Sequence, residues 1–89
     1  MGPDTDEMLR SVGEEYRDLR GTRREVRRSD RLSEDLEIDS LLAQELLDRM
    51  EDRLGIEVIG DPRLAEITTA GQLAELLEEL TLELPDARR

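Results

Sequence analysis

Hydrophobic residues recur at helical spacing in three separate stretches of the chain. In residues 7–20, four apolar side chains fall at i, i+3, i+7 and i+10 and so share one face of a helix: Leu9, Val12, Tyr16 and Leu19. Residues 4–6 offer side chains that can cap a helix, and Gly21 is suited to end one. We therefore expect a helix over residues 7–20, preceded by a flexible amino terminus of residues 1–6.

The second stretch, residues 40–54, divides into an apolar and an acidic face. The predicted buried face has five members, spaced as on one side of a helix: Ala43, Leu46, Leu47, Met50 and Leu54. Leu41 lies off that face and heads an acidic row. That row is Glu45, Asp48 and Asp52. An exposed leucine among acids is a candidate docking feature, and the alternative is that Leu41 packs beneath the preceding loop. Leu42 lies at the border of the two faces, and Gly55 is expected to end the helix.

A short helix and a last long helix are predicted after an apolar connection. That connection contains Ile56, Val58 and Ile59. Asp61 and Pro62 have the pattern of an N-cap followed by a proline at the first helical position, which predicts a short helix to about residue 66. Thr69 and Gln72 then have capping-box spacing. The apolar stripe that follows comprises Ala70, Leu73, Leu76, Leu77, Leu80 and Leu84. Pro85 is expected to close this helix before a flexible tail, residues 85–89.

Residues 22–35 contain only Val26 and Leu32 as apolar anchors among arginines and acids. We interpret them as a long connecting loop, in which the spacing of Thr22 and Glu25 suggests one capped helical turn. Long loops in compact domains are uncommon and often functional. No strand alternation is long enough to pair. The predicted fold class is therefore all-α, a small four-helix bundle with three longer helices and one short helix, forming one domain over residues 7–84.

Composition restricts the chemistry that such a bundle performs. The chain has 89 residues, of which 24 are acidic and 13 are basic, all arginine, for a net charge of −11. Cysteine and histidine are absent, so no thiol nucleophile, thiolate metal site or imidazole base is available. A chain this short also has little room for an enclosed pocket. We therefore expect a protein that is not an enzyme and binds no metal, with most acids forming a solvated face.

Charge is unevenly distributed along the chain. Residues 17–31 contain seven arginines and three acids, whereas residues 32–84 contain three arginines and 15 acids. The acidic segment is expected to repel nucleic acid and anionic membranes and to attract a basic protein. We interpret the arginines as neutralising the acidic helices in preference to binding phosphate or nucleic acid. Because no membrane span or signal peptide is recognisable, we expect a cytoplasmic protein. We also expect it to be a monomer.

Residues 32–41 form the segment most informative about function. Ser40 is predicted in the first turn of a helix, where the helix dipole and free amides stabilise an anion on its hydroxyl by roughly 0.3–1 kcal/mol. A phosphodiester on Ser40 would fit this position. The alternative is that Asp39 or Ser40 merely caps the helix, the commonest role for such residues. Leu42 and Ala43, however, stand where a capping box would have Glu or Gln.

The run Leu36-Glu37-Ile38-Asp39-Ser40-Leu41 resembles the phosphopantetheine attachment motif of acyl carrier proteins. The resemblance covers about residues 32–80, and further matches are Leu32, Glu34-Asp35-Leu36, Glu45-Leu46, Glu51-Asp52, Ile56-Glu57-Val58 and Ile67-Thr68-Thr69. It implies a four-helix bundle whose serine receives 4′-phosphopantetheine from coenzyme A through a separate magnesium-dependent transferase. Because the chain has no cysteine, the thiol that carries cargo would come from this arm.

The resemblance also implies roles for individual residues. Ser40 would be the attachment nucleophile and Asp39 an acidic contact beside it. The residues that would contact partner enzymes are Leu41, Leu42, Glu45, Asp48, Glu51 and Asp52. The expected partners are a phosphopantetheinyl transferase and acyltransferase, ketosynthase or adenylating enzymes with basic docking surfaces.

Three functions follow from these patterns. The first is a free-standing carrier of acyl or polyketide intermediates. The second is an aminoacyl or peptidyl carrier, because residues 40–43 resemble the opening of helix 2 in peptidyl carrier domains. The third, from another class, is an unmodified acidic adaptor that binds a basic partner through Leu41 and its neighbouring acids.

Three positions depart from the carrier-protein pattern. Glu37 stands where carriers commonly have glycine, which restricts the backbone angles available to the loop and adds a charge. Asp48 replaces a commonly exposed apolar residue of fatty-acid carriers, and Leu42 stands where an acid is frequent. These departures indicate partners other than those of fatty-acid synthesis.

Overall fold

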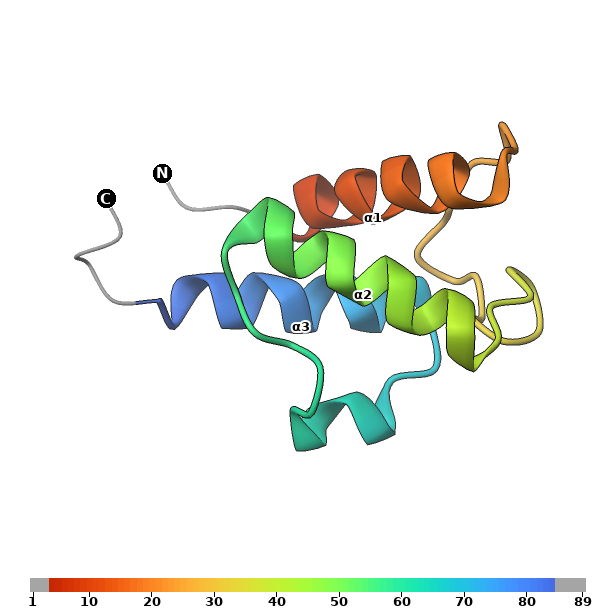
Figure 1. Ribbon diagram of the computed structural model, residues 1–89. Helices are drawn as coiled ribbons and strands as arrows, with labels where there is room; N and C mark the ends of the chain where they lie inside the picture. The colour runs from red at the N-terminus through yellow and green to blue at the C-terminus, as the bar shows by residue number, and fades with distance from the viewer. Residues whose placement is uncertain (1–3, 85–89) are drawn as a thin grey trace.

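Three α-helices and one short 3₁₀ helix make up the computed structural model, which describes residues 4–84 (Figure 1). Helix α1 spans Thr5–Arg20, α2 Ser40–Leu54, the 3₁₀ helix η1 Pro62–Glu66, and α3 Ala70–Leu82. Within the described residues there is no strand, only an isolated bridge between Arg31 and Thr69. The predicted all-α class is confirmed, with a 3₁₀ helix as the short fourth element.

The helix ends follow the capping residues in the sequence. The Asp4 carboxylate accepts the Glu7 amide at 2.7 Å, so α1 begins at Thr5, two residues before the predicted start. Thr5 and Asp6 therefore form the first helical turn, and their assignment to a flexible terminus was wrong. Gly21 and Gly55 end α1 and α2 in the left-handed conformation, as predicted.

The third long helix also has its predicted start. Thr69 and Gln72 form a reciprocal capping box at α3, and Asp61 caps η1 ahead of Pro62. Helix α3 ends at Leu82, and Leu84 packs partly against the core. The predictions for residues 1–3, for Pro85 and for the tail, residues 85–89, lie outside the described residues.

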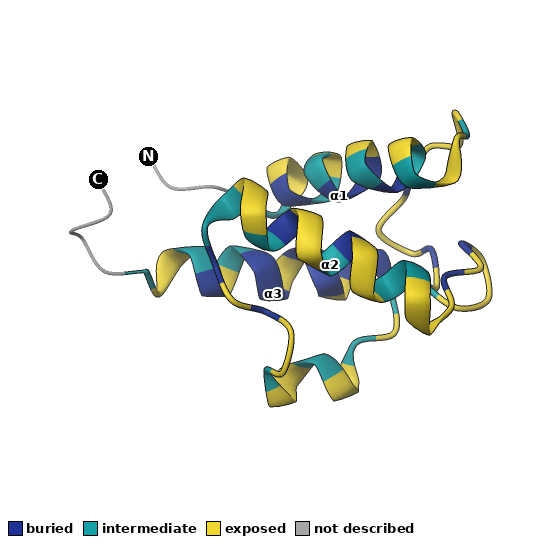
Figure 2. Ribbon diagram, viewed as in Figure 1, coloured by how far each residue is buried: buried dark blue, intermediate teal, exposed yellow. Residues whose placement is uncertain are grey.

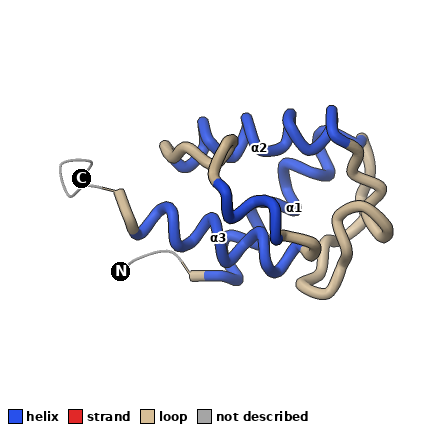
Figure 3. The backbone as a smooth tube through the Cα atoms, turned by 90° about the horizontal axis from the view of Figure 1, so that it is seen from below, coloured by secondary structure: helices blue, strands red, loops and turns tan. Residues whose placement is uncertain are grey.

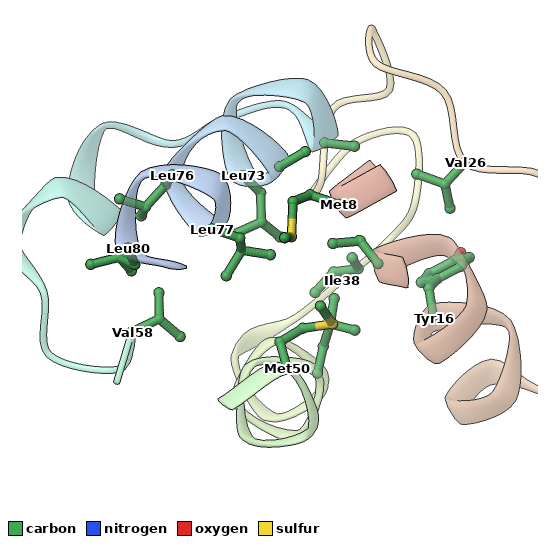
Figure 4. Close-up of a cluster of buried hydrophobic side chains, with 14 of the residues drawn as sticks. Met8, Tyr16, Val26, Ile38, Met50, Val58, Leu73, Leu76, Leu77 and Leu80 are labelled. Atoms are coloured by element: carbon green, nitrogen blue, oxygen red, sulfur yellow. The ribbon is translucent and has the colours of Figure 1, made fainter. Parts of the chain in front are cut away.

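The core lies where the three long helices meet (Figures 1 and 4). Helix α1 packs against both α2 and α3, and the centre of its buried face is Met8, Val12 and Tyr16. Leu9 and Leu19, which we predicted in this stripe, flank it and are half-buried. The predicted α3 stripe through Leu80 is fully buried, and Figure 4 shows Leu73 and Leu77 near Met8 and Leu80 near Val58.

Helix α2 is less deeply buried than its apolar stripe predicts. Leu46 and Met50 are buried, but three other members of the stripe are only half-buried: Ala43, Leu47 and Leu54. Figure 2 shows α2 with much of its visible side exposed. None of the helices within residues 4–84 is long and apolar enough to cross a membrane.

The long loop between α1 and α2 is bound to the start of α3 (Figure 3). The backbone carbonyls of Arg28 and Asp30 accept the amides of Gly71 and Ala70 at 2.9 and 2.8 Å, which satisfies two free donors of that helix. The Leu32 amide donates to the Thr68 carbonyl at 2.9 Å. This loop is therefore an ordered part of the bundle that leads directly into α2.

The loop lacks the helical turn that the Thr22 and Glu25 spacing suggested. Residues 22–27 have no regular structure, and Thr22 Oγ1 accepts the Arg24 amide at 3.3 Å. A threonine that bonds two residues ahead forms a local turn in place of a helix cap.

Candidate functional site

Asp39 and Ser40 occupy different roles at the start of α2. Asp39 is the N-cap, and its Oδ1 accepts the Leu42 amide at 2.8 Å. Ser40 is the first helical residue; it is exposed, and its hydroxyl makes no hydrogen bond within residues 4–84. The sequence allowed either Asp39 or Ser40 to cap the helix. Asp39 is the cap, and the Ser40 hydroxyl is therefore left free for modification.

Buried residues of the preceding loop fix the position of Ser40. Leu36 and Ile38 are both buried, and the Tyr16 hydroxyl donates to the Leu36 carbonyl at 2.9 Å inside the bundle. The Ile38 amide donates to the Leu32 carbonyl, also at 2.9 Å. The loop is therefore anchored to α1 by a side chain and to itself by backbone hydrogen bonds.

Glu37 takes up the backbone conformation that favours glycine. Its φ is 55°, and it is the only non-glycine residue with a positive φ among those described. An L-residue in this region is strained by roughly 1–2 kcal/mol. The carboxylate lies 3.6 Å from the Arg20 guanidinium, and the side chain is 75% exposed. Glu37, which stands where carrier proteins commonly have glycine, therefore does occupy a backbone conformation that favours glycine.

Leu41 and three acids form an exposed surface, which we call the acidic face of α2 (Leu41, Glu45, Asp48 and Asp52). Leu41 is 69% exposed, so its predicted exposure is confirmed and packing beneath the loop is excluded. The three acids are exposed and form no ion pair within residues 4–84. Arg49 and Arg53 of the same helix bind acids of α1 instead, namely Glu14, Glu15 and Asp18. This face consequently keeps its full negative charge.

Two residues predicted to contact partners have internal roles. Glu51 is half-buried, and its Oε2 accepts the amides of Val58 and Ile59 at 2.7 and 2.8 Å. Its carboxylate therefore holds the connection after α2, an internal role that the prediction of partner contact did not include. Leu42 is half-buried against the core. The helical pattern alone does not reveal the Glu51 contacts, because they depend on how the chain turns back after Gly55.

An apolar cavity of about 230 Å³ lies beside the start of α2. Its lining residues are aliphatic and come from the loop, α2, η1 and α3: Leu32, Ile38, Ala43, Leu46, Leu47, Leu64, Ile67 and Leu73. The cavity explains why Ala43 and Leu47 remain half-buried. The length of the chain led us to expect little room for a pocket. The sequence does not reveal this cavity, because its lining residues come from separate segments that meet only in the folded protein.

Four of the seven arginines of residues 17–31 form ion pairs within residues 4–84, and three of these four pair with acids of the loop before α2. Arg24 donates to both carboxylate oxygens of Asp30 at 2.9 and 3.0 Å, and this lowers the pKa of that buried carboxyl. Arg31 pairs with Glu34 and Asp35, while Arg28 reaches Asp6 of α1. Neutralisation is therefore mainly local, and not against the acidic helices as predicted. Among residues 4–84, no group of three or more acidic side chains is arranged to hold a metal ion.

Residues 21–77 match the protein-family model described as a phosphopantetheine attachment site (PP-binding). The match extends over more than half of the chain and includes the loop, Ser40 and most of α3. The chain belongs to this family of phosphopantetheine-binding carriers. The resemblance to acyl carrier proteins is thereby confirmed. A comparison with curated proteins found no match.

Membership in this family implies a covalently attached 4′-phosphopantetheine. The residues at the start of α2 fit such a group, because an exposed hydroxyl lies free beside the amide end of a helix. When attached, the group supplies the thiol that this chain does not contain. Carriers of this family interact in general with transferases and with biosynthetic enzymes.

Proposed function

We propose that this carrier is modified at Ser40 and holds acyl or polyketide intermediates as thioesters. The observation that carries the proposal is the division of roles at the start of α2, where Asp39 caps the helix and the Ser40 hydroxyl stays free and exposed. A phosphodiester on this oxygen is stabilised by the positive end of the helix dipole. In this account the chain positions the hydroxyl and the cargo, while separate enzymes perform the chemistry.

The cavity beside α2 supports an acyl or polyketide cargo. All of its lining residues are aliphatic, and each methylene that leaves water for such surroundings gains about 0.8 kcal/mol. A polar aminoacyl group would gain little there. The peptidyl-carrier alternative rests on the sequence of residues 40–43, and the unmodified adaptor rests on the acidic face of α2.

The acidic face of α2 is the proposed docking surface for enzymes that act on the arm. Its unpaired acids attract basic surfaces, and Leu41 offers an apolar contact that is buried only in a complex. The proposed partners are the phosphopantetheinyl transferase and acyltransferase, ketosynthase or adenylating enzymes. Glu51 is left out of this surface because it binds the backbone of its own chain.

Loading can be tested by intact mass after incubation with coenzyme A, magnesium and a broad-specificity phosphopantetheinyl transferase. The wild-type protein should gain one phosphopantetheine, and Ser40→Ala should gain none while keeping its helical circular dichroism spectrum. Ser33→Ala is the matched control, because Ser33 is also exposed in the loop before α2. Loading of Ser40→Ala would place the attachment elsewhere, and an unmodified wild type would favour the adaptor.

The class of cargo can be tested by thermal unfolding of the loaded protein. An octanoyl arm should raise the melting temperature above that of the free-thiol form, whereas an alanyl arm should not, because only the octanoyl chain fills the apolar cavity. Leu47→Gln, which places a polar side chain in the cavity wall, should reduce the octanoyl effect. An equal rise with both arms would remove the argument for acyl over aminoacyl cargo.

A further inference from the structure

Glu37 combines a strained backbone with an exposed charge. Its φ of 55° is one that glycine adopts freely, so a glutamate here costs stability that glycine would not. The side chains of Leu36 and Ile38 on either side are buried in the bundle. Glu37 itself is exposed and contributes no packing to the core. Burial of the side chain therefore does not offset the free-energy cost of the backbone strain.

The only ion pair of Glu37 within the described residues is easily replaced. Its carboxylate lies 3.6 Å from Arg20, with the two side chains 75% and 38% exposed. Such a solvent-exposed pair contributes little to stability and competes poorly with a better-placed cation. The carboxylate is therefore available to a lysine or arginine of another protein.

Glu37 lies close to the proposed attachment site. Two residues separate it from Ser40, so their Cα atoms are at most about 11 Å apart. This is near the distance of about 8–10 Å over which charges act at physiological salt. An enzyme that reaches the Ser40 hydroxyl brings its own surface within range of this charge. Asp39, which is closer, uses one carboxylate oxygen to cap α2.

We propose that the Glu37 carboxylate is a specificity-determining contact for the phosphopantetheinyl transferase, in which a lysine or arginine of the enzyme replaces Arg20. This inference rests on the proposed function of Ser40. Arg20 then acts as a placeholder that neutralises Glu37 until the enzyme binds. The charge extends the acidic face of α2 to the other side of Ser40, into the loop that precedes the helix.

The test compares kcat/KM for loading among four variants. Glu37→Gln and Glu37→Gly should each lower kcat/KM about threefold, mainly through KM, as expected for loss of one exposed ion pair. The loss should disappear near 1 M salt, where the screening length falls to about 3 Å. Arg20→Gln should load as fast as wild type or faster. Glu57→Gln, an equal charge change in the loop at the opposite end of α2, should have no effect.

The variants separate recognition from a structural role. If the Arg20–Glu37 pair merely holds the loop in place, Arg20→Gln and Glu37→Gln should slow loading equally, and that result would overturn the proposal. Equal rates for Glu37→Gln and wild type would also overturn it while leaving the function of Ser40 intact. A wild-type protein that gains no phosphopantetheine at all would refute the proposed function and this inference together.

Discussion

Alanine at two helical glycines is expected to change stability in opposite directions. At both Gly13 in α1 and Gly71 in α3, an added Cβ would lie 3.0 Å from its nearest neighbour. At Gly13 that neighbour is Nη1 of Arg17, the far end of a flexible side chain. At Gly71 it is the backbone carbonyl oxygen of Arg28, with the Arg28 Cβ at 3.2 Å. The same distance therefore has different consequences.

The magnitudes follow from what has to move. Replacing glycine by alanine inside a helix gains about 1 kcal/mol, and at Gly13 the Arg17 guanidinium moves aside at small cost. Gly13→Ala should therefore stabilise the protein by about 0.5–1 kcal/mol. At Gly71 the obstructing carbonyl also accepts the Gly71 amide at 2.9 Å. Overpacking costs about 1–3 kcal/mol and a weakened hydrogen bond about 1 kcal/mol, so Gly71→Ala should be destabilising by about 1–3 kcal/mol.

Urea unfolding of both variants measures these differences, and thermal unfolding should show shifts of about 4–8 °C per kcal/mol in a domain of this size. Amide hydrogen exchange of Leu32 and Ala70, which bond between the loop and the start of α3, should accelerate in Gly71→Ala and stay unchanged in Gly13→Ala. If Gly71→Ala stabilised the protein as much as Gly13→Ala, the loop backbone at Arg28 would have moved away from α3. That result would refute the claim that this close contact is rigid.

Three further predictions concern the acidic face, the core and acid stability. Leu41→Ala should cost less than about 1 kcal/mol because the side chain is 69% exposed, whereas Leu46→Ala in the core should cost about 2–5 kcal/mol; equal losses of melting temperature would contradict the docking role of Leu41. Reversing the charges of Glu45 and Asp52 together should slow loading steeply at low salt and less at high salt, and a salt-independent ratio of rates would exclude electrostatic steering. Arg24 lowers the folded-state pKa of Asp30, so the stability from this carboxylate is present above its ordinary value of about 3.9 and is lost as pH falls through the lowered value. In urea unfolding between pH 7 and pH 2, Asp30→Asn should therefore be less stable than wild type at neutral pH, and the difference should shrink in acid.

Local chemistry made the helices predictable. The Asp61-Pro62 start of η1 and the Thr69–Gln72 capping box each depend on side chains that bond within three residues, and such patterns can be read directly from the sequence. Periodicity likewise placed Leu41 outside the core, because the direction of a side chain on a helix is set by its position in the turn.

Long-range contacts were not predictable in this way. Nothing in the residues near Glu51 indicates that its carboxylate binds amides on the far side of Gly55. The apolar cavity was missed for a similar reason, because Leu32 and Leu64 both line it only once η1 has packed against α3. The positive φ of Glu37 was not predicted, since residue type alone favours an ordinary conformation there; the resemblance to carrier proteins indicated only that glycine is common at this position.

The attachment of the long loop to the start of α3 also affects the order in which the protein forms. A chain leaves the ribosome amino end first, so α1, the loop and α2 emerge before Ala70 and Gly71, whose amides bind the loop carbonyls. Until those amides arrive, closing the loop costs conformational entropy without the two hydrogen bonds that join it to α3. A chain that ends before Ala70 therefore contains Ser40 without the hydrogen bonds that join its loop to α3. If a transferase recognises this loop as we propose, its substrate would be complete only after α3 has been added.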